Sequence, residues 1–317
     1  MMKPIPHDLI TGDTGIFDVK QFVYPSGMFG DDYFAKRGVC LIGTVGKQTP
    51  ESIGLGDELM PGNVAIRAER LADNYEAYRR NTGPFAKSKD GFVIASQEEA
   101  VKRFNVLHSV LGLHIPILRP IANQNGGGKN LIKFDSHKAT ERPIGDSAYV
   151  DNEAGAAGFS PADCPIVCVA AVNPNNSSIQ TAIFHFGYLP VGDGIGEVMA
   201  NCLKRLKGEK YELYAFISAG ISSIEVRAER ATPLLQLRDT DEVFKSNSQT
   251  MSDGKIVVRL GDYAEGLLKS AGISGNEIER CRIDTTDPDA PPYSNRLVST
   301  KGAINGCNAV VFGYRPA

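Results

Sequence analysis

The sequence predicts one α/β or α+β domain, because of the way its apolar runs and turn signals alternate. Ile166–Val172 is a continuous apolar run, which is typical of a strand covered on both faces. Asn173–Ser178 (NPNNSS) is a strong turn signal, and Thr181–Phe186 is expected to return as an antiparallel strand. Strands and helices follow in irregular order after this hairpin, which favours one domain over two.

The other expected elements come from periodicity and capping signals, taken in chain order. Asn63 is expected to cap one helix, and Ser96 with Glu99 has the capping-box spacing for a second helix that ends at Gly112. Three consecutive glycines at 126–128 predict a loop. Further elements are expected as short strands at 131–134, 214–217, 255–260 and 309–312, and as helices after Gly196 and over 263–271.

Length, composition and charge exclude several classes of protein. The 317 residues are 42% hydrophobic and 22% charged, which is ordinary globular usage and argues against general disorder. A net charge of −3 argues against an electrostatic nucleic-acid surface. No apolar stretch reaches the ~18 residues of a membrane span, and Met1–Thr11 lacks a signal-peptide core. We therefore expect a cytoplasmic protein with reduced cysteines and neither a membrane nor a nucleic-acid partner.

A cysteine and a histidine flank the predicted hairpin symmetrically. Cys164 and His185 are equidistant from the midpoint between Pro174 and Asn175, so a symmetric turn would place them directly opposite each other. Their side chains would then share one face of the sheet, with Cβ atoms ~4.5–5.5 Å apart. Two unrelated core residues would give the same pattern, since free cysteine is often buried.

Two chemistries would use such a pair. An imidazole beside a thiol stabilises the thiolate, which is a nucleophile. Alternatively, sulfur and imidazole nitrogen bind zinc or copper when a further ligand completes the site. The pattern of residues leaves the choice between these two open.

Several segments, in order, resemble the laccase-domain family, which is also described as multicopper polyphenol oxidase-like or purine nucleoside phosphorylase-like. The similarity extends over residues 96–317. It rests on GDSAYV (145–150), PADCPIVCVAAV (161–172), HFGY (185–188), SAGISSIEV (218–226), DTTDPDAPPYSNRL (284–297) and GCNA (306–309), with weaker segments at 103–113 and 123–126. The resemblance implies a single laccase-domain-like α/β (α+β) domain with a mixed, largely antiparallel central sheet and packed helices. Residues 1–95 would be an N-terminal extension or a divergent part of the same domain.

The same resemblance implies a function and a set of site residues. Family members act on purine nucleosides, by phosphorolysis and sometimes by adenosine deamination, at a His–Cys–His site that binds zinc or copper. Cys164 matches the family cysteine, His185 the second histidine, and Arg296 an arginine suited to an anion such as phosphate. These three are the expected catalytic residues. The residues expected to bind substrate are Asn125, Asp163 and Tyr188.

The chain departs from the family pattern at several of these positions. Asn125 stands where the family has its first histidine, and Tyr188 and Leu189 replace a tryptophan and an arginine. Only Cys164 and His185 remain as metal ligands, and an amide oxygen is a poor ligand for zinc. We therefore predict that a zinc or copper ion is bound weakly or not at all.

Three functions remain open at this stage. The first is an enzyme that acts on a purine nucleoside and phosphate, with Asn125 and Arg296 in the same pocket as the Cys164–His185 pair. The second is a metal-free Cys–His hydrolase or deamidase, since a dyad needs no third ligand. The third is a catalytically lapsed family member that binds a ligand or partner. The sequence does not indicate an oligomeric state.

Overall fold

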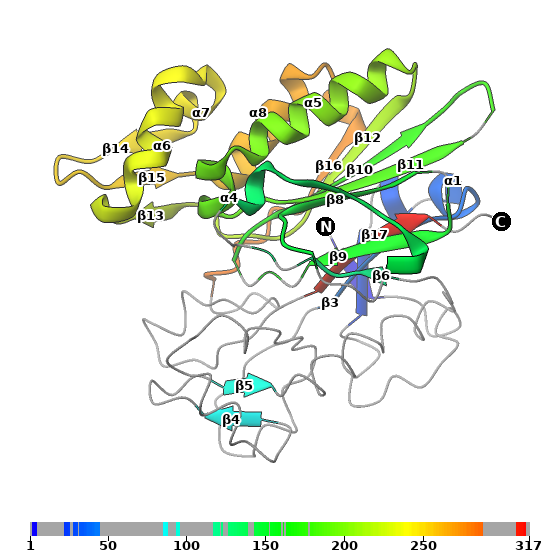
Figure 1. Ribbon diagram of the computed structural model, residues 1–317, viewed down its shortest axis with the longest axis horizontal. Helices are drawn as coiled ribbons and strands as arrows, with labels where there is room; N and C mark the ends of the chain where they lie inside the picture. The colour runs from blue at the N-terminus through cyan, green and yellow to red at the C-terminus, as the bar shows by residue number, and fades with distance from the viewer. Residues whose placement is uncertain are drawn as a thin grey trace.

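Two six-stranded sheets lie face to face in the computed structural model, and helices cover the outer face of one of them (Figure 1). One sheet has the strand order β1-β2-β3-β17-β9-β6, and the other has the order β16-β12-β10-β11-β8-β7. The structure describes residues 2–4, 22–25, 28–30, 32–44, 85–87, 93–95, 117–120, 122, 126–138, 143–151, 153–159, 161, 163–176, 178–287 and 309–314.

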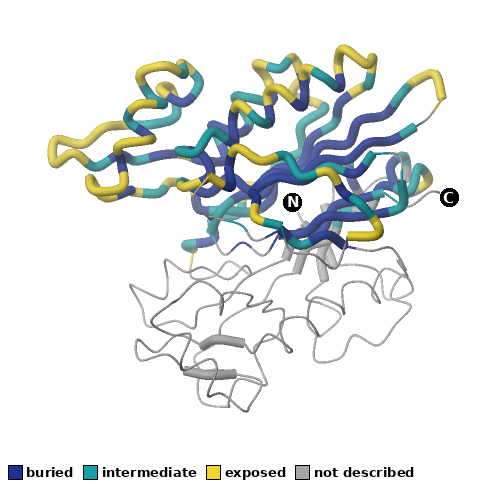
Figure 2. The backbone as a smooth tube through the Cα atoms, in the orientation of Figure 1, coloured by how far each residue is buried: buried dark blue, intermediate teal, exposed yellow. Residues whose placement is uncertain are grey.

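The second sheet is the centre of the fold and carries the predicted hairpin. Its strands are β16 (Ile278–Arg280), β12 (Glu212–Ile217), β10 (Ile166–Val172), β11 (Ile179–His185), β8 (Ser147–Asp151) and β7 (Leu131–Lys133). Every residue of β10 and β11 is buried, as expected of strands that are covered on both faces (Figure 2). The pairings β10·β11, β10·β12 and β11·β8 are antiparallel, whereas β12·β16 and β7·β8 are parallel.

The first sheet joins segments from both ends of the described chain. It contains β1 (Met2–Pro4), β2 (Phe22–Pro25), β3 (Val39–Thr44), β17 (Ala309–Tyr314), β9 (Gly155–Phe159) and β6 (Ile117–Leu118). β17 pairs with β3 on one side and with β9 on the other, so the N-terminal strands share a sheet with the C-terminal strand. The division at residue 95 remains a prediction.

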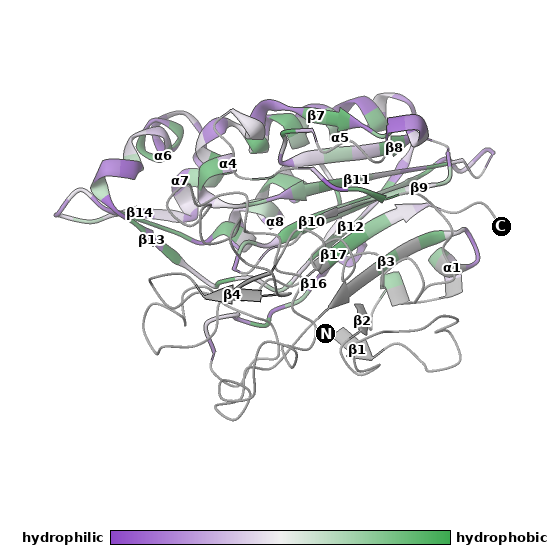
Figure 3. Ribbon diagram, turned by 60° about the horizontal axis from the view of Figure 1, so that its bottom comes forward, coloured by the Kyte–Doolittle hydropathy of each residue, from purple (hydrophilic) through white to green (hydrophobic). Residues whose placement is uncertain are grey.

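Alternate residues of β10 and β11 belong to two different hydrophobic clusters. Val167, Val169 and Ala171 pack with helices α4 (Tyr188–Asp193), α5 (Ile195–Gly208) and α8 (Leu260–Ser270). Ile166 and Cys168 pack instead against residues of the first sheet, such as Phe159 and Phe312. The helices turn polar outer faces to solvent, and the strands between the layers are apolar (Figure 3). The layers are therefore helix, sheet and sheet.

The remaining elements lie around these layers. A three-stranded sheet of β13 (Ile224–Val226), β15 (Ile256–Val258) and β14 (Ser248–Thr250) packs with α6 (Ala228–Thr240) and α7 (Glu242–Ser246) at one end of the molecule (Figure 1). The short elements are η3 (Met28–Gly30), α1 (Asp32–Ala35), β4 (Phe85–Lys87), β5 (Val93–Ala95), η7 (Gly127–Lys129), η8 (Ser136–Lys138) and η9 (Gly275–Glu277).

Most of the elements expected after residue 126 are confirmed, with shifts at their ends. The periodic segment after Gly196 forms α5, whose buried Met199, Cys202, Leu203 and Leu206 follow the helical repeat. The expected helix 263–271 starts earlier, at Leu260, as α8. The helices expected after Asn63 and after Ser96 fall outside the described residues. The mixed α/β fold class itself is confirmed.

Candidate functional site

A buried histidine at the end of β11 is the centre of the candidate site. His185 is 3% exposed, and its Nδ1 lies 2.8 Å from Oδ1 of the fully buried Asp146. Its ring stacks on Phe159, with the ring centroids 5.8 Å apart. The partly exposed Cys164 lies near enough to His185 to interact with its imidazole. Cys164, His185 and Asp146 therefore form one cluster of interacting side chains.

The register prediction for the hairpin was wrong by two residues. His185 lies opposite Ile166, not opposite Cys164, which precedes the first residue of β10. The turn after β10 accounts for this shift. The side chains of Asn173 and Asn176 each accept a hydrogen bond from the backbone N–H two residues further along the chain. A shift of two residues preserves the alternation of faces, so Cys164 stays on the same face as His185.

The charge of His185 depends on its two neighbours. Burial lowers the pKa of His185, but the charges and hydrogen bonds of Cys164 and Asp146 outweigh burial and raise this pKa to about 9. The imidazole is therefore protonated at neutral pH, with Nδ1–H donating to Asp146. The Asp146 carboxylate stabilises the positive charge of this imidazolium through the Nδ1 hydrogen bond.

Sequence reasoning missed Asp146, although it lies in the quoted segment GDSAYV. The main chain brings it to the histidine, because the His185 N–H donates to the Asp146 carbonyl at 2.8 Å, one step beyond the β11·β8 ladder. The available signal was an acidic residue directly before a buried strand. Nothing local in the sequence indicates that this strand pairs with β11.

The glycine-rich segment closes over Asp146 and is not an open loop. Gly127 and Gly128 are buried in η7, and the Asp146 N–H donates to the Gly127 carbonyl at 3.2 Å. A Cβ atom at Gly127 would lie 2.6 Å from Oδ2 of Asp146, so no side chain fits there. The Gly126 N–H also donates to Oδ2 of Asp193 at 2.8 Å, which ties the segment to α4. These glycines permit close backbone packing around the site.

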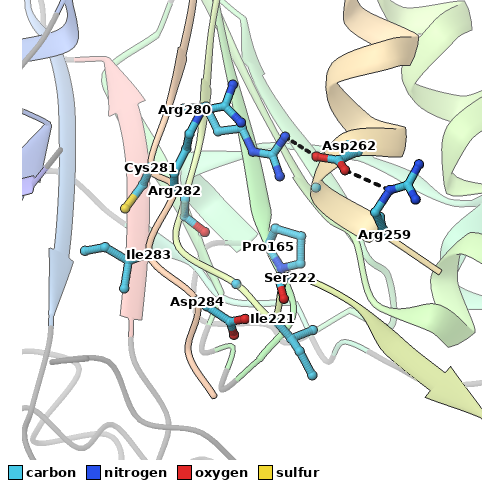
Figure 4. A pocket seen from close by; sticks show the side chains of 13 residues that line it. Pro165, Ile221, Ser222, Arg259, Asp262, Arg280, Cys281, Arg282, Ile283 and Asp284 are labelled. Atoms are coloured by element: carbon cyan, nitrogen blue, oxygen red, sulfur yellow. Dashed lines mark hydrogen bonds and ion pairs between the residues drawn. The ribbon is translucent and has the colours of Figure 1, made fainter. Parts of the chain in front are cut away.

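A separate pocket of about 250 Å³ lies next to Pro165 (Figure 4). Its described lining includes Pro165 but neither Cys164 nor His185. Two of its arginines are paired with carboxylates: Arg280 Nη1 lies 2.5 Å from Asp262 Oδ1 and 2.8 Å from Glu265 Oε2, and Arg259 Nε lies 3.0 Å from Asp262 Oδ2. The described lining carries three arginines and two aspartates, and it does not include the thiol.

The structure places some of the other predicted site residues. Asp163 accepts a hydrogen bond from Thr285 at 2.9 Å, directly beside Cys164. Tyr188 packs against the helix-covered cluster and its hydroxyl accepts from Arg230 at 2.9 Å, so it does not lie on the His185 face. Asn125 and Arg296 fall outside the described residues. His137, in η8, is exposed.

The described residues do not fit a metal centre of the family type. Cys164 supplies one soft donor, and His185 supplies Nε2 as a second, since its Nδ1 bonds Asp146 as in a carboxylate–histidine–metal arrangement. Within the described ranges, no three or more His, Cys, Asp and Glu side chains are arranged to hold a metal ion. Two protein ligands are one fewer than a catalytic zinc site uses. We therefore derive the chemistry from the side chains alone.

The fold and the site together define a class: mixed α/β proteins with a cysteine–histidine pair at the open end of a central hairpin. The family model described as "Multi-copper polyphenol oxidoreductase laccase" matches residues 80–310, which is most of the chain. The chain belongs to this family, as its sequence motifs indicated. No curated protein matches it.

Solved structures show the same fold. A hypothetical protein YfiH from Bacillus licheniformis has a TM-score of 0.61 at 17% identity, covering 89% of this chain and 94% of its own. YlmD from Geobacillus stearothermophilus has a TM-score of 0.61 at 16% identity, covering 96% and 99%. The Neisseria meningitidis protein NMB0706 has a TM-score of 0.57 at 15% identity, covering 88% and 95%. Within the described ranges, the helices are too short or too polar to span a bilayer.

Proposed function

We propose that this chain is a thiol enzyme that breaks a carbon–nitrogen bond in a purine nucleoside, by phosphorolysis or by deamination. The observation that carries the proposal is the cluster of Cys164, His185 and Asp146, in which Asp146 is hydrogen-bonded to His185 and Cys164 interacts with the imidazole. Membership of the laccase-domain family supports a small-molecule substrate. The motifs shared with that family support purine nucleosides as the substrate class.

The roles of the three residues follow from their contacts. Asp146 holds Nδ1 of His185, which leaves the other ring nitrogen to face the thiol. The protonated imidazole is a general acid for the nitrogen that leaves, and the Cys164 sulfur is the nucleophile. Since Cys164 is the partly exposed member of the three, substrate approaches from its side.

Deamination balances with these groups alone. The Cys164 thiolate adds to the carbon that carries the amino group, and His185 gives its proton to that amino nitrogen, which leaves as ammonia. Neutral His185 then removes a proton from water, and the hydroxide displaces the sulfur. This step restores the thiolate, the imidazolium and a carbonyl product.

Phosphorolysis uses the same acid. An oxygen of hydrogen phosphate attacks the anomeric carbon, the glycosidic bond breaks, and the departing purine nitrogen takes the proton of His185. The neutral imidazole then regains a proton from the hydrogen phosphate group of the sugar phosphate product. Arg296, the residue predicted to bind phosphate, is assigned here from the family resemblance alone.

The test is turnover of inosine and adenosine, each with and without phosphate, with detection of free base and of ammonia. The purified wild-type protein is expected to release one of them. Cys164→Ser and His185→Gln are expected to lower the rate at least ~100-fold. Cys281→Ser, on the separate pocket, serves as the control. Absence of turnover by the wild-type protein with both nucleosides would overturn the purine assignment.

A metal-free Cys–His hydrolase or deamidase that acts on an amide is the second candidate. It is favoured by the third member, Asp146, because a thiol, an imidazole and a carboxylate suffice for acyl transfer without a metal. In this case the protein would release ammonia from glutamine-containing peptides and leave nucleosides untouched. Rapid alkylation of Cys164 in a protein that holds no metal would favour this hydrolase, whereas the absence of both metal and turnover would favour the catalytically lapsed member.

A further inference from the structure

Cys164 lies outside the strand ladder, yet both of its chain neighbours are fixed by distant segments. The Asp163 carbonyl accepts from the Ile221 N–H at 2.7 Å, and the Pro165 carbonyl accepts from the Phe186 N–H at 2.9 Å. β10 begins only at Ile166. The position of the thiol therefore depends on these contacts and not on sheet pairing of Cys164 itself.

A single buried threonine joins two of the segments involved. Thr285 is 1% exposed, and its Oγ1 donates to Oδ1 of Asp163 at 2.9 Å, across 122 residues of sequence. Its N–H donates to the Gly220 carbonyl at 3.2 Å, next to a bridge between Gly220 and Asp284. Thr285 is thus bonded both to Asp163, the residue before Cys164, and to the loop 218–223 between β12 and β13, called the 220 loop below.

The 220 loop contacts Pro165, the residue after Cys164. A Cβ atom at Gly220 would lie 2.9 Å from the nitrogen and from Cδ of Pro165, so the two backbones are in direct contact. Figure 4 shows Pro165, Ile221 and Asp284 together on the wall of the neighbouring pocket. The segment Asp163–Pro165 is therefore clamped on both sides of the thiol.

We propose that Thr285 is a positioning residue for Cys164, which holds the sulfur against His185 through Asp163 and Gly220. The activity readout below rests on the proposed function, whereas the labelling readout does not. A hydrogen bond to a carboxylate is stronger than a neutral one, and water has little access to the buried Thr285 hydroxyl to replace it. A displacement of ~1 Å at a reacting atom costs about 100-fold in rate.

The test compares Thr285→Val, which removes the hydroxyl at nearly constant volume, with Thr285→Ser, which keeps the hydroxyl. Thr286→Val is the matched control, because the Thr286 hydroxyl donates to Asp284 at 2.7 Å and not to Asp163. The labelling rate of Cys164 with iodoacetamide is measured at pH 7, with melting temperature and turnover for each variant.

Thr285→Val is expected to lower the labelling rate at pH 7 about tenfold, because the sulfur moves away from His185. Thr285→Ser is expected to restore the wild-type rate, and Thr286→Val to leave it unchanged. If Thr285→Val does not fold, Asp163→Asn weakens the same bond and is expected to lower the rate in the same way.

An unchanged labelling rate in a folded Thr285→Val protein overturns the proposal, as does an equal change in Thr286→Val. A lowered rate in Thr285→Val, in a protein whose wild type turns over no nucleoside, would uphold the positioning role and reject the proposed function. Each of the two proposals can therefore be rejected without rejecting the other.

Discussion

At its turn, the β10–β11 hairpin is held by near neighbours in the sequence, whereas its open end is held by distant segments. Asn173 accepts from the Asn175 N–H at 2.9 Å, and Asn176 accepts from the Ser178 N–H at 3.0 Å, both in exposed positions. At the open end, His185 meets Asp146 across 39 residues and Ile166 meets Ser218 across 52 residues. Both of these contacts are buried.

The difference shows where polar contacts matter energetically. Water replaces a lost hydrogen bond at the exposed turn, so the net loss there is small. A partner removed at the buried end leaves a polar or charged group without solvent, which costs far more. The loss of a polar contact is therefore expected to destabilise the protein more at the end of the hairpin that carries the thiol than at the turn.

The largest expected effect comes from Asp146→Asn. The amide keeps the shape of the side chain but removes the charge that favours the imidazolium, so the pKa of His185 falls. Turnover is expected to fall by ~100- to 10,000-fold, with a smaller change in KM. Steady-state kinetics check this, with Asp193→Asn as the control, since Asp193 bonds the glycine segment and not His185. Equal losses in both variants would mean that Asp146 acts only through folding.

The second effect concerns metal content. We predict that the unmodified protein retains little or no zinc after dialysis, and that Asn125→His gains close to one zinc per chain. The reason is that a second imidazole would be the third ligand beside Cys164 and His185. Metal analysis checks this, with Asn125→Ala and the double variant Asn125→His/Cys164→Ser as controls. Tight stoichiometric zinc in the unmodified protein would refute the prediction and point to His137 or another residue.

The third effect is on stability against pH. The folded state raises the pKa of His185 from 6.5 to about 9, so it binds this proton more tightly than the unfolded chain does. The contribution is complete below pH ~6.5 and is lost as pH rises through ~9, at about 1.4 kcal/mol for each pKa unit. Denaturant unfolding at pH 6, 7.5 and 9 checks this. The variant His185→Gln is expected to lose this part of the slope, and an identical slope would contradict the assignment.

The smallest effect is expected at the turn. Asn173→Ala removes one exposed side-chain hydrogen bond and is expected to lower the free energy of unfolding by about 0.5 kcal/mol, with turnover and Cys164 labelling unchanged. Thermal melting and iodoacetamide labelling check this. A loss of labelling would show that the turn controls the open end.

The same contrast explains what the sequence could predict. β10, α5 and the fold class follow from apolar periodicity and turn residues, which are local signals. The face shared by Cys164 and His185 was also predictable, because it depends only on the alternation along two strands. The register was not, since it depends on the side-chain hydrogen bonds of Asn173 and Asn176. Asp146 and Thr285 could not be placed, because their partners lie 39 and 122 residues away.

The aromatic ring of Phe159 has a consequence for spectroscopy. It is 3% exposed and stacks on His185 at an interplanar angle of 24°, which screens the imidazole from bulk water. Protons on a nitrogen that is both screened and hydrogen-bonded exchange slowly with solvent. The Nδ1–H of His185 is therefore expected as a separate downfield proton resonance that persists in water, and its chemical shift would report the bond to Asp146 directly.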